Sequence, residues 1–326
     1  MVPHGTFGNN HGASMVELPG GGMLVAWFAG QREGAGDTRI LLSRCAGSGC
    51  SAPATVVTAG ERAQGSLLRR RTVGNCALFL AEDGTLWLFY NAVAIGGWAG
   101  SVVDYKVSRD LGRSWSPGRN LLGELGTLVR GVPLSSGPGR ILLPVYNGLG
   151  KAQSYACLIT HQAGAPASVS CGERTAEDGG IQPSIARLPN GRLLALMRDK
   201  RGRSIRRAWS SNEGMHWSAV DGIGLPNPDS SVALAALDDG RLLLAYNPTG
   251  RNVLALAISR DQGATFEYLK DFESSPDSNA EFSYPVLLQA KDGLIHLAYT
   301  HWRKSIKHAV FDKAWLNAPP RGALRP

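Results

Sequence analysis

The chain has 326 residues, of which 43% are hydrophobic and 41 are glycines, and its formal net charge is +8. This size allows a large core in one or two domains, and the glycine content favours many tight turns over long helices. The positive charge suits an anionic ligand, although it can equally reflect the source's overall protein composition. No run approaches about 18 apolar residues and no basic tail is present, so we expect neither a membrane partner nor a nucleic-acid partner.

A glycine-containing turn between two short apolar runs recurs along the chain. Its six copies follow one another at intervals of about 50 to 63 residues, which is enough for four strands and their turns. Asp-Gly or Asn-Gly between apolar runs is a strong hairpin signal. We therefore predict an all-β, six-bladed propeller that forms a single domain over residues 1–317, with a Pro-rich peripheral tail at residues 318–326. The copies occupy residues 17–27, 81–90, 137–144, 188–196, 238–246 and 291–299.

A second motif, Ser-x-Asp-x-Gly-x-x-Trp, falls in a later hairpin of three predicted blades. It is complete at residues 108–115, has Asn in place of Asp at residues 210–217, and has Phe in place of Trp at residues 259–266. Ser and Asp oxygens accept hydrogen bonds from nearby backbone N–H groups and Gly accepts a positive φ, so each copy suits a tight turn. The register places these turns on outer hairpins, and we interpret them as scaffold.

The five cysteines suggest two disulfides at weakened copies of this turn. Cys45 and Cys50 stand where the first blade would carry the Asp and the aromatic residue, Cys157 and Cys171 flank the turn of the third blade, and Cys76 is left over. If both pairs are disulfides, a periplasmic or secreted location is favoured; reduced thiols would indicate the cytoplasm, and the N-terminus does not resemble a signal peptide. No Cys/His cluster has zinc spacing, and we expect no metal and no cofactor.

Two rings of equivalent positions should surround the mouth of the propeller axis, because the innermost strand of every blade borders that axis. Most of these positions are polar although they bracket apolar runs, and buried polar groups are costly unless they are paired. We expect a wet mouth that holds a polar ligand; the alternative is that these side chains plug the axis around water. The first ring consists of Gly12, Asn75, Arg130, Gln182, Ser231 and Tyr284, and the second of Phe28, Asn91, Tyr146, Arg198, Asn247 and Thr300.

The repeated Ser-x-Asp-x-Gly-x-x-Trp turn resembles the Asp-box of sialidases, and six blades match the sialidase propeller over nearly the whole chain. Sialidases hold the substrate carboxylate with three arginines, use a Tyr–Glu pair as the nucleophile and use an Asp as the general acid/base. The resemblance implies that Tyr284 is the nucleophile and Asp37 the general acid/base. It also implies that Arg198 and Arg251 are the second and third arginines, whose guanidinium groups clamp a carboxylate.

Three positions depart from the sialidase pattern. His11 stands in the place of the first arginine, Gln182 in that of the Glu that activates the Tyr, and Thr300 in that of the Glu that braces the first arginine. Gln cannot take a proton, so the usual activation of the Tyr is missing. The chain resembles a divergent branch of sialidase-like bacterial propellers, and some of their relatives act on uronic-acid glycans with a His as the principal catalyst. His11 is therefore a candidate general acid or base.

Several further side chains are candidates for the site. Glu33 shares a Gly-rich loop with Asp37 and is a candidate second carboxylate. Arg303 and His301 bring positive charge beside the sixth blade, where Arg303 could replace the missing arginine. Trp98 could stack on a sugar face, with a packing role as the equal alternative. The remaining candidate substrate contacts are Arg130, Asn75, Gln182, Asn227 and Glu281.

Three functions agree with this pattern. The first is an exo-glycosidase that hydrolyses a terminal acidic sugar, sialic acid or a related one, by retaining chemistry. The second is a uronate-glycan hydrolase or lyase that uses His11 and Tyr284, and the third is a non-catalytic glycan-binding propeller marked by Gln182. We expect the first, with an acidic glycan or glycoconjugate as the partner of a monomeric protein, although propeller topology alone does not assign a function.

Overall fold

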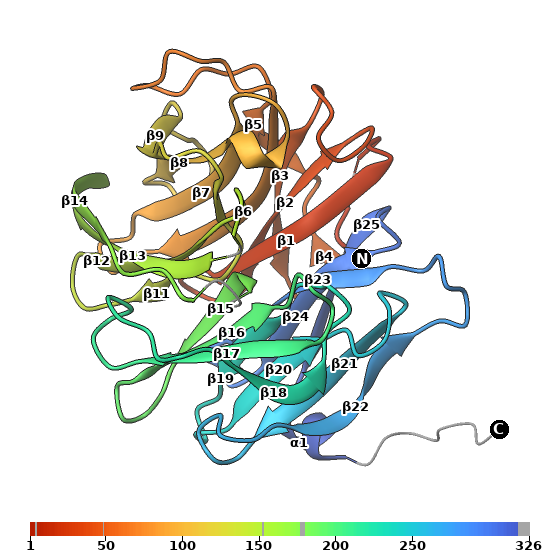
Figure 1. Cartoon of the computed structure of the whole chain (residues 1–326). Helices are drawn as coiled ribbons and strands as arrows, with labels where there is room; N and C mark the ends of the chain where they lie inside the picture. The colour runs from red at the N-terminus through yellow and green to blue at the C-terminus, as the bar shows by residue number, and fades with distance from the viewer. Residues whose placement is uncertain (4, 48, 152, 177–179, 319–326) are drawn as a thin grey trace.

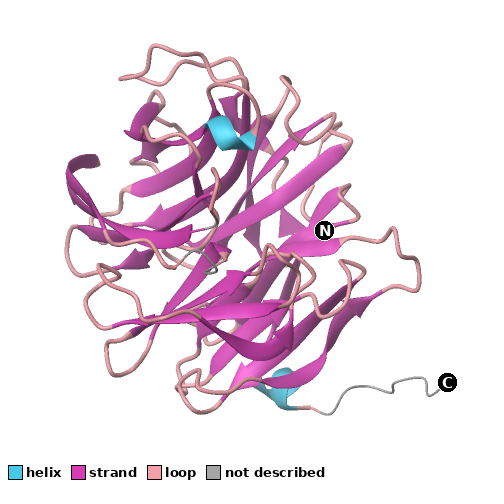
Figure 2. Ribbon diagram, in the orientation of Figure 1, coloured by secondary structure: helices cyan, strands magenta, loops and turns pink. Residues whose placement is uncertain are grey.

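The computed structural model describes residues 1–3, 5–47, 49–151, 153–176 and 180–318, and its strands form six antiparallel sheets arranged in a ring (Figure 1). Strands dominate, and the described helical segments are the short η1 (Trp98–Gly100) and α1 (Lys313–Asn317) (Figure 2). The chain is therefore an all-β, six-bladed propeller, as the repeats predicted. Residues 319–326 of the predicted tail lie outside the described residues.

Each sheet is one blade, and the elements follow the chain. The first blade contains β1 (Asn9–Glu17), β2 (Met23–Gly30), β3 (Arg39–Ala46), β4 (Gly49–Cys50) and β5 (Ala54–Thr58), with β4 and β5 both paired to β3. The second contains β6 (Thr72–Leu80), β7 (Leu86–Val93), β8 (Ser101–Ser108) and β9 (Arg119–Leu122). The third contains β10 (Thr127–Val129), β11 (Leu134–Ser135), β12 (Arg140–Asn147), β13 (Gln153–Gln162) and β14 (Ala165–Cys171), with β10 and β11 both paired to β12.

The remaining three blades have a simpler order. The fourth contains β15 (Ile181–Arg187), β16 (Leu193–Arg198), β17 (Ser204–Ser210) and β18 (Asp221–Pro226). The fifth contains β19 (Ala233–Ala236), β20 (Leu242–Tyr246), β21 (Val253–Ser259) and β22 (Glu267–Ser274). The sixth contains β23 (Phe282–Gln289), β24 (Ile295–His301) and β25 (Ser305–Phe311).

The N-terminal segment pairs with the last strand of the sixth blade and closes the ring. The backbone N–H of Val2 donates to the carbonyl of Ile306 at 2.9 Å, which adds the N-terminal segment to the free edge of β25. The N–H of Asn10 likewise donates to the carbonyl of Arg303. Blade one and blade six are therefore joined by backbone hydrogen bonds as well as by packing.

The blades pack against one another through apolar side chains. Every residue of β2 and of β7 is buried, which explains why these segments read as continuous apolar runs. Leu78 and Leu24 belong to a cluster that joins the first two blades, and Trp27 and Val286 belong to one that joins the first and sixth. The hydrophobic core therefore consists of clusters between neighbouring blades. The polar ends of the inner strands lie outside these clusters, at the axis.

The repeated turn lies on outer hairpins, as predicted. In the copy between β8 and β9, the hydroxyl oxygen of Ser108 accepts from the N–H of Gly112 at 2.8 Å, and Oδ1 of Asp110 accepts from the N–H groups of Arg113 and Ser114 at 3.0 and 2.8 Å. The hydrogen bonds from Ser114, ahead of those from Ser108 and Arg113, hold the pKa of Asp110 well below its usual value. The motif satisfies its own backbone and is scaffold.

Both predicted disulfides are present. Cys45 pairs with Cys50 between β3 and β4, and Cys157 pairs with Cys171 between β13 and β14. Cys76 is a buried free thiol, and burial raises its pKa to about 12. Among the described residues, the helices are too short to cross a bilayer.

Candidate active site

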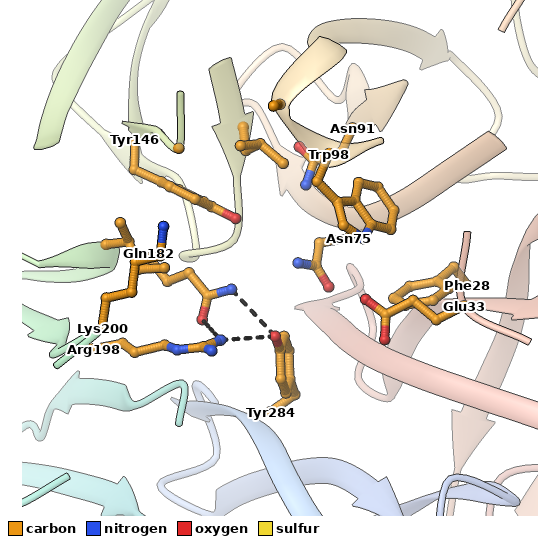
Figure 3. Close-up of a pocket in the computed structure, with 14 residues that line it drawn as sticks. Phe28, Glu33, Asn75, Asn91, Trp98, Tyr146, Gln182, Arg198, Lys200 and Tyr284 are labelled. Atoms are coloured by element: carbon orange, nitrogen blue, oxygen red, sulfur yellow. Dashed lines mark hydrogen bonds between the residues drawn. The ribbon is translucent and has the colours of Figure 1, made fainter. Parts of the chain in front are cut away.

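A pocket of about 260 Å³ opens where the inner strands of the blades begin (Figure 3). Its walls combine aromatic and polar side chains, and most of the polar ones come from the two predicted rings. It is lined by Phe28, Glu33, Asn75, Asn91, Trp98, Ala99, Leu128, Tyr146, Gly148, Ile181, Gln182, Arg198, Lys200 and Tyr284. The sequence register therefore located a pocket that most of the ring positions surround.

A bulge at equivalent places in the inner strands turns these side chains toward the pocket. The pairing register shifts between Val73 and Cys76 in blade two, between Ile181 and Ser184 in blade four, and between Ser283 and Val286 in blade six. Bulges re-aim side chains and are frequent beside active sites. Asn75, Gln182 and Tyr284 are the residues that these three bulges present to the pocket.

Gly12 occupies the equivalent bulge of blade one, and the pocket requires glycine there. Its φ is +68°, and a Cβ atom would lie 2.4 Å from Oδ1 of Asn75 and 2.9 Å from Cε1 of Phe28. The bulge of blade one therefore presents no side chain to the pocket. The ring of Phe28, on the neighbouring strand β2, lines the pocket there instead.

The hydroxyl of Tyr284 is held by two donors from the fourth blade. Nη1 of Arg198 donates to it at 3.0 Å and Nε2 of Gln182 at 3.4 Å, and Nη1 also donates to Oε1 of Gln182 at 3.3 Å. Nε of Arg198 donates to Asp229 at 2.6 Å. Burial opposes the charge on Arg198, but Tyr284 and Asp229 outweigh it and raise the pKa of the guanidinium. The arrangement fixes the phenol oxygen in the pocket and surrounds it with donors (Figure 3).

The ring of Tyr284 is flanked by cationic and aromatic groups. The guanidinium carbon of Arg130 lies 5.3 Å from the ring centroid and that of Arg251 lies 5.5 Å from it. The imidazole of His11 packs against the same ring with a centroid distance of 4.1 Å. The ring of Tyr284 is therefore enclosed by two guanidinium groups and an imidazole, and its hydroxyl is the part that reaches the pocket.

Arg251 and Arg303 are engaged by carboxylates of the protein. Glu281 accepts from Nη1 of Arg251 at 3.0 Å and from Nε of Arg303 at 2.6 Å, and Nη1 of Arg303 donates to Glu33 at 2.8 Å. Burial opposes ionisation of Glu281, but the hydrogen bonds from Arg303 and Ser283 outweigh it and lower its pKa. The cations that line the pocket itself are Arg198 and Lys200.

His11 lies behind Tyr284 instead of at the pocket surface, which differs from its expected catalytic position. It is buried, its Nδ1 lies 2.9 Å from the hydroxyl of Thr300, and its Nε2 has no hydrogen-bond partner among the described residues. Burial, and then the positive charges of Arg303 and Arg251, hold its pKa well below the usual value. His11 is a neutral support for the ring of Tyr284.

Seven other predicted site residues also lie outside the pocket lining: Arg130, Arg251, Glu281 and Arg303, and with them Asp37, Asn227 and His301. Oδ2 of Asp37 accepts from the N–H of Gln31 at 3.0 Å, so Asp37 closes the base of the loop that carries Glu33. Asn227 is fully buried, and its amide oxygen accepts from the N–H groups of Asp199 and Ser230. Nε2 of His301 faces Glu273 at 3.3 Å, away from the pocket. Asp37 thus closes a loop, Asn227 stabilises a buried turn, and His301 belongs to an ion-pair cluster. These structural roles explain why the last three side chains lie outside the pocket.

Lys200 and Asp229 were not predicted for the site. Lys200 follows Arg198 by two residues and lines the same pocket. Its closeness in sequence to a predicted site arginine could have indicated it. Asp229 lies in the loop before β19 with a φ of +51° and reaches Arg198 across blades. No local pattern in the sequence indicates this contact.

Comparison with known proteins identifies the family. A family model described as a BNR repeat-like domain matches residues 21–297. No curated protein matches the chain. Among solved structures, the Hadza microbial sialidase Hz136 superposes with a TM-score of 0.76 at 17% identity, covering 94% of this chain and 66% of that one, so this chain spans about two thirds of its length.

Other matching structures agree in fold and differ in activity. The intramolecular trans-sialidase from Ruminococcus gnavus superposes with a TM-score of 0.73 at 14% identity, with 95% of this chain and 96% of that chain covered. The α-L-arabinanase of Penicillium chrysogenum gives 0.66 at 13% identity, covering 95% and 96%, and a Dyadobacter fermentans protein of unknown function gives 0.71 at 15% identity, covering 95% of each chain. These identities establish the shared propeller alone.

Proposed function

The chain belongs to the BNR repeat-like domain family, and from this premise we propose that it is a glycoside hydrolase that removes a terminal acidic sugar, sialic acid or a related one, from a glycan. Structural neighbours that are named as sialidases and as an arabinanase support the class of reaction. The small volume of the pocket supports action on one terminal sugar.

One observation carries the proposal: the hydroxyl of Tyr284 lies in the pocket, held by Arg198 and Gln182. A Tyr nucleophile suits an anionic sugar, because a carboxylate nucleophile would be repelled by the negative charge of that sugar. Arg198 and Lys200 supply the positive charge that an acidic group requires. Trp98 offers an aromatic face for the sugar ring.

Glu33 is the group best placed to exchange protons with the substrate, since it is the one carboxylate among the described lining residues. In the first step Tyr284 gives its proton to solvent and its oxygen bonds to the anomeric carbon, while the bond to the leaving oxygen breaks and that oxygen takes a proton from Glu33. In the second step water bonds to the same carbon and gives a proton back to Glu33, and the tyrosine oxygen leaves and regains its proton from solvent. The role implied for Asp37 thus passes to Glu33.

The two alternative functions have less support. A uronate-glycan hydrolase or lyase that relies on His11 would need that imidazole in the pocket, whereas it lies behind the ring of Tyr284. A non-catalytic glycan-binding propeller remains the alternative that Gln182 motivates.

A panel of fluorogenic sialosides, other ulosonic acids, uronides and rhamnosides tests the proposal. We expect turnover of one acidic glycoside, abolished by Tyr284→Phe. Turnover of a uronide that is lost in both His11→Ala and Tyr284→Phe would favour the uronate enzyme instead. Binding of an acidic glycoside without turnover of any would identify a glycan-binding propeller.

A further inference from the structure

Arg130 is a buried cation without a carboxylate partner among the described residues. It is 4% exposed, and its terminal nitrogens donate to the carbonyls of Ala13 at 3.2 Å and Pro285 at 2.8 Å. Its Nε has no hydrogen-bond partner in the described part of the chain. Two neutral carbonyls do not neutralise a guanidinium, and an uncompensated buried charge is strongly destabilising. The position therefore calls for a counter-ion.

Three groups that could lose a proton act electrostatically on Arg130, and burial disfavours ionisation of two of them. Burial lowers the pKa of Arg130, while Tyr284, Cys76 and Tyr146 oppose that effect. Burial raises the pKa of Cys76 to about 12 and raises that of Tyr146 as well, so both keep their protons. Tyr284 is the one of the three whose ring packs against the guanidinium, with the guanidinium carbon of Arg130 5.3 Å from the ring centroid.

The surroundings of Tyr284 suit a negative oxygen. Arg130 lies over its ring at 5.3 Å, and the hydroxyl receives hydrogen bonds from Arg198 and Gln182. Hydrogen bonds donated to the charged form and an opposite charge nearby both favour that form. A carboxylate in place of the Gln182 amide would repel the same charge and would compete for Arg198.

We propose that Tyr284 is the counter-ion of Arg130 and works as a phenolate, so that Arg130, Arg198 and Gln182 together take the place of a carboxylate base. Tyr284 releases its proton to solvent before substrate binds, and the same charges stabilise the oxygen when it leaves the anomeric carbon. Arg130 is a positioning residue, since it acts through Tyr284 and does not touch the pocket. The role as nucleophile rests on the proposed function, whereas the charge state does not.

The test is a titration of the full-length protein, followed by the near-ultraviolet absorbance of phenolate, with Tyr284→Phe subtracted to isolate one tyrosine. We expect this signal to develop at a lower pH than that of an ordinary tyrosine. Arg130→Met should move its midpoint upward by about two pH units, equivalent to about a hundredfold less phenolate at neutral pH. Arg130→Lys, which keeps the charge, should restore most of the shift.

Arg251→Met is the matched control, because Arg251 lies over the same ring but is partly exposed and paired with Glu281. It should move the midpoint less than Arg130→Met does. Gln182→Glu provides a second route if Arg130→Met does not fold, and should also move the midpoint upward. The proposal is overturned if the wild-type signal appears only near pH 10, the ordinary range of tyrosine, or if the folded Arg130→Met and Gln182→Glu variants leave the midpoint unchanged. A shifted titration in a protein that hydrolyses no glycoside would refute the proposed function alone.

Discussion

Gln182 and Tyr284 stand at equivalent bulges of the fourth and sixth blades, and their side chains meet with Nε2 3.4 Å from Oη. Both residues have left-handed backbones, with φ values of 56° and 53°. Such conformations cost about 1 kcal/mol or more for residues other than glycine, and they persist where the surrounding structure enforces them. Here the enforced geometry brings side chains of the fourth blade to the hydroxyl oxygen of Tyr284 in the sixth.

Removal of that oxygen should abolish turnover. We expect Tyr284→Phe to lower kcat by about a thousandfold or more with little change in substrate affinity, because the phenyl ring still fills its place among Arg130, Arg251 and His11. Tyr146→Phe is the control, since it removes a hydroxyl from another lining tyrosine, and its effect should stay below about tenfold. Steady-state kinetics with equilibrium binding of substrate distinguish the two. Equal losses in both variants would contradict the role of Tyr284.

The roles of Glu33 and Asp37 can be distinguished by how each variant's rate depends on the leaving group of the substrate. Glu33→Gln should reduce hydrolysis of a substrate with a poor leaving group by about a hundredfold or more, and should reduce it less when the leaving group departs easily, because such a group needs no proton. Asp37→Asn should show no such dependence, since Asp37 accepts from the N–H of Gln31 outside the pocket lining. Rates on aryl and alkyl glycosides measure this. The opposite pattern would restore Asp37 as the acid/base.

Stability should fall as the solution is acidified through the range of an ordinary histidine. The pKa of His11 is lowered in the folded protein, so the unfolded chain binds that proton at higher pH than the folded chain does. The stability that His11 contributes is complete above its unfolded pKa of about 6.5 and is lost progressively below it, with a slope of up to about 1.4 kcal/mol per pH unit.

Urea unfolding at several pH values between about 7 and 5 checks this expectation, with His11→Gln as the comparison. The variant should show a shallower slope, because the other titrating groups remain in both proteins. Parallel curves would mean that His11 is not held neutral by its burial beside Tyr284.

The repeated turn should matter for stability and not for activity. Asp110→Ala removes the acceptor of two backbone N–H groups, and we expect it to lower Tm by a few degrees without changing kcat. Asp110→Asn is the matched control, because Asn212 fills the same place in blade four and accepts from the N–H of His216 at 2.9 Å. Thermal unfolding and activity assays measure both effects. A loss of activity at unchanged Tm would show that the turn is not scaffold.

The sequence predicted the blades and most of the pocket, because both follow from a repeat that keeps its register. Asn75, Gln182, Arg198 and Tyr284 were found by counting from hairpin glycines, and all of them line the pocket. Such counting works for strand residues, because strand pairing fixes the direction in which each side chain points.

The loops could not be predicted in the same way. Glu33 and Asp37 share one loop, and which of them reaches the pocket depends on how that loop folds back. The pairing of Arg303 with Glu33 joins segments 270 positions apart, and no local pattern indicates it. Asn227 was misplaced for the same reason, since its hydrogen bonds stabilise a buried turn.

The hydrogen bond between Val2 and Ile306 has a consequence for biosynthesis. A ribosome releases the first blade long before the last, so the N-terminal segment waits without its edge partner until β25 emerges. The contact of His11 with Tyr284 likewise joins the first blade to the sixth. A nascent chain that is several blades long therefore has neither a closed ring nor the tyrosine that packs against His11, and the pocket is complete only once the last blade has docked.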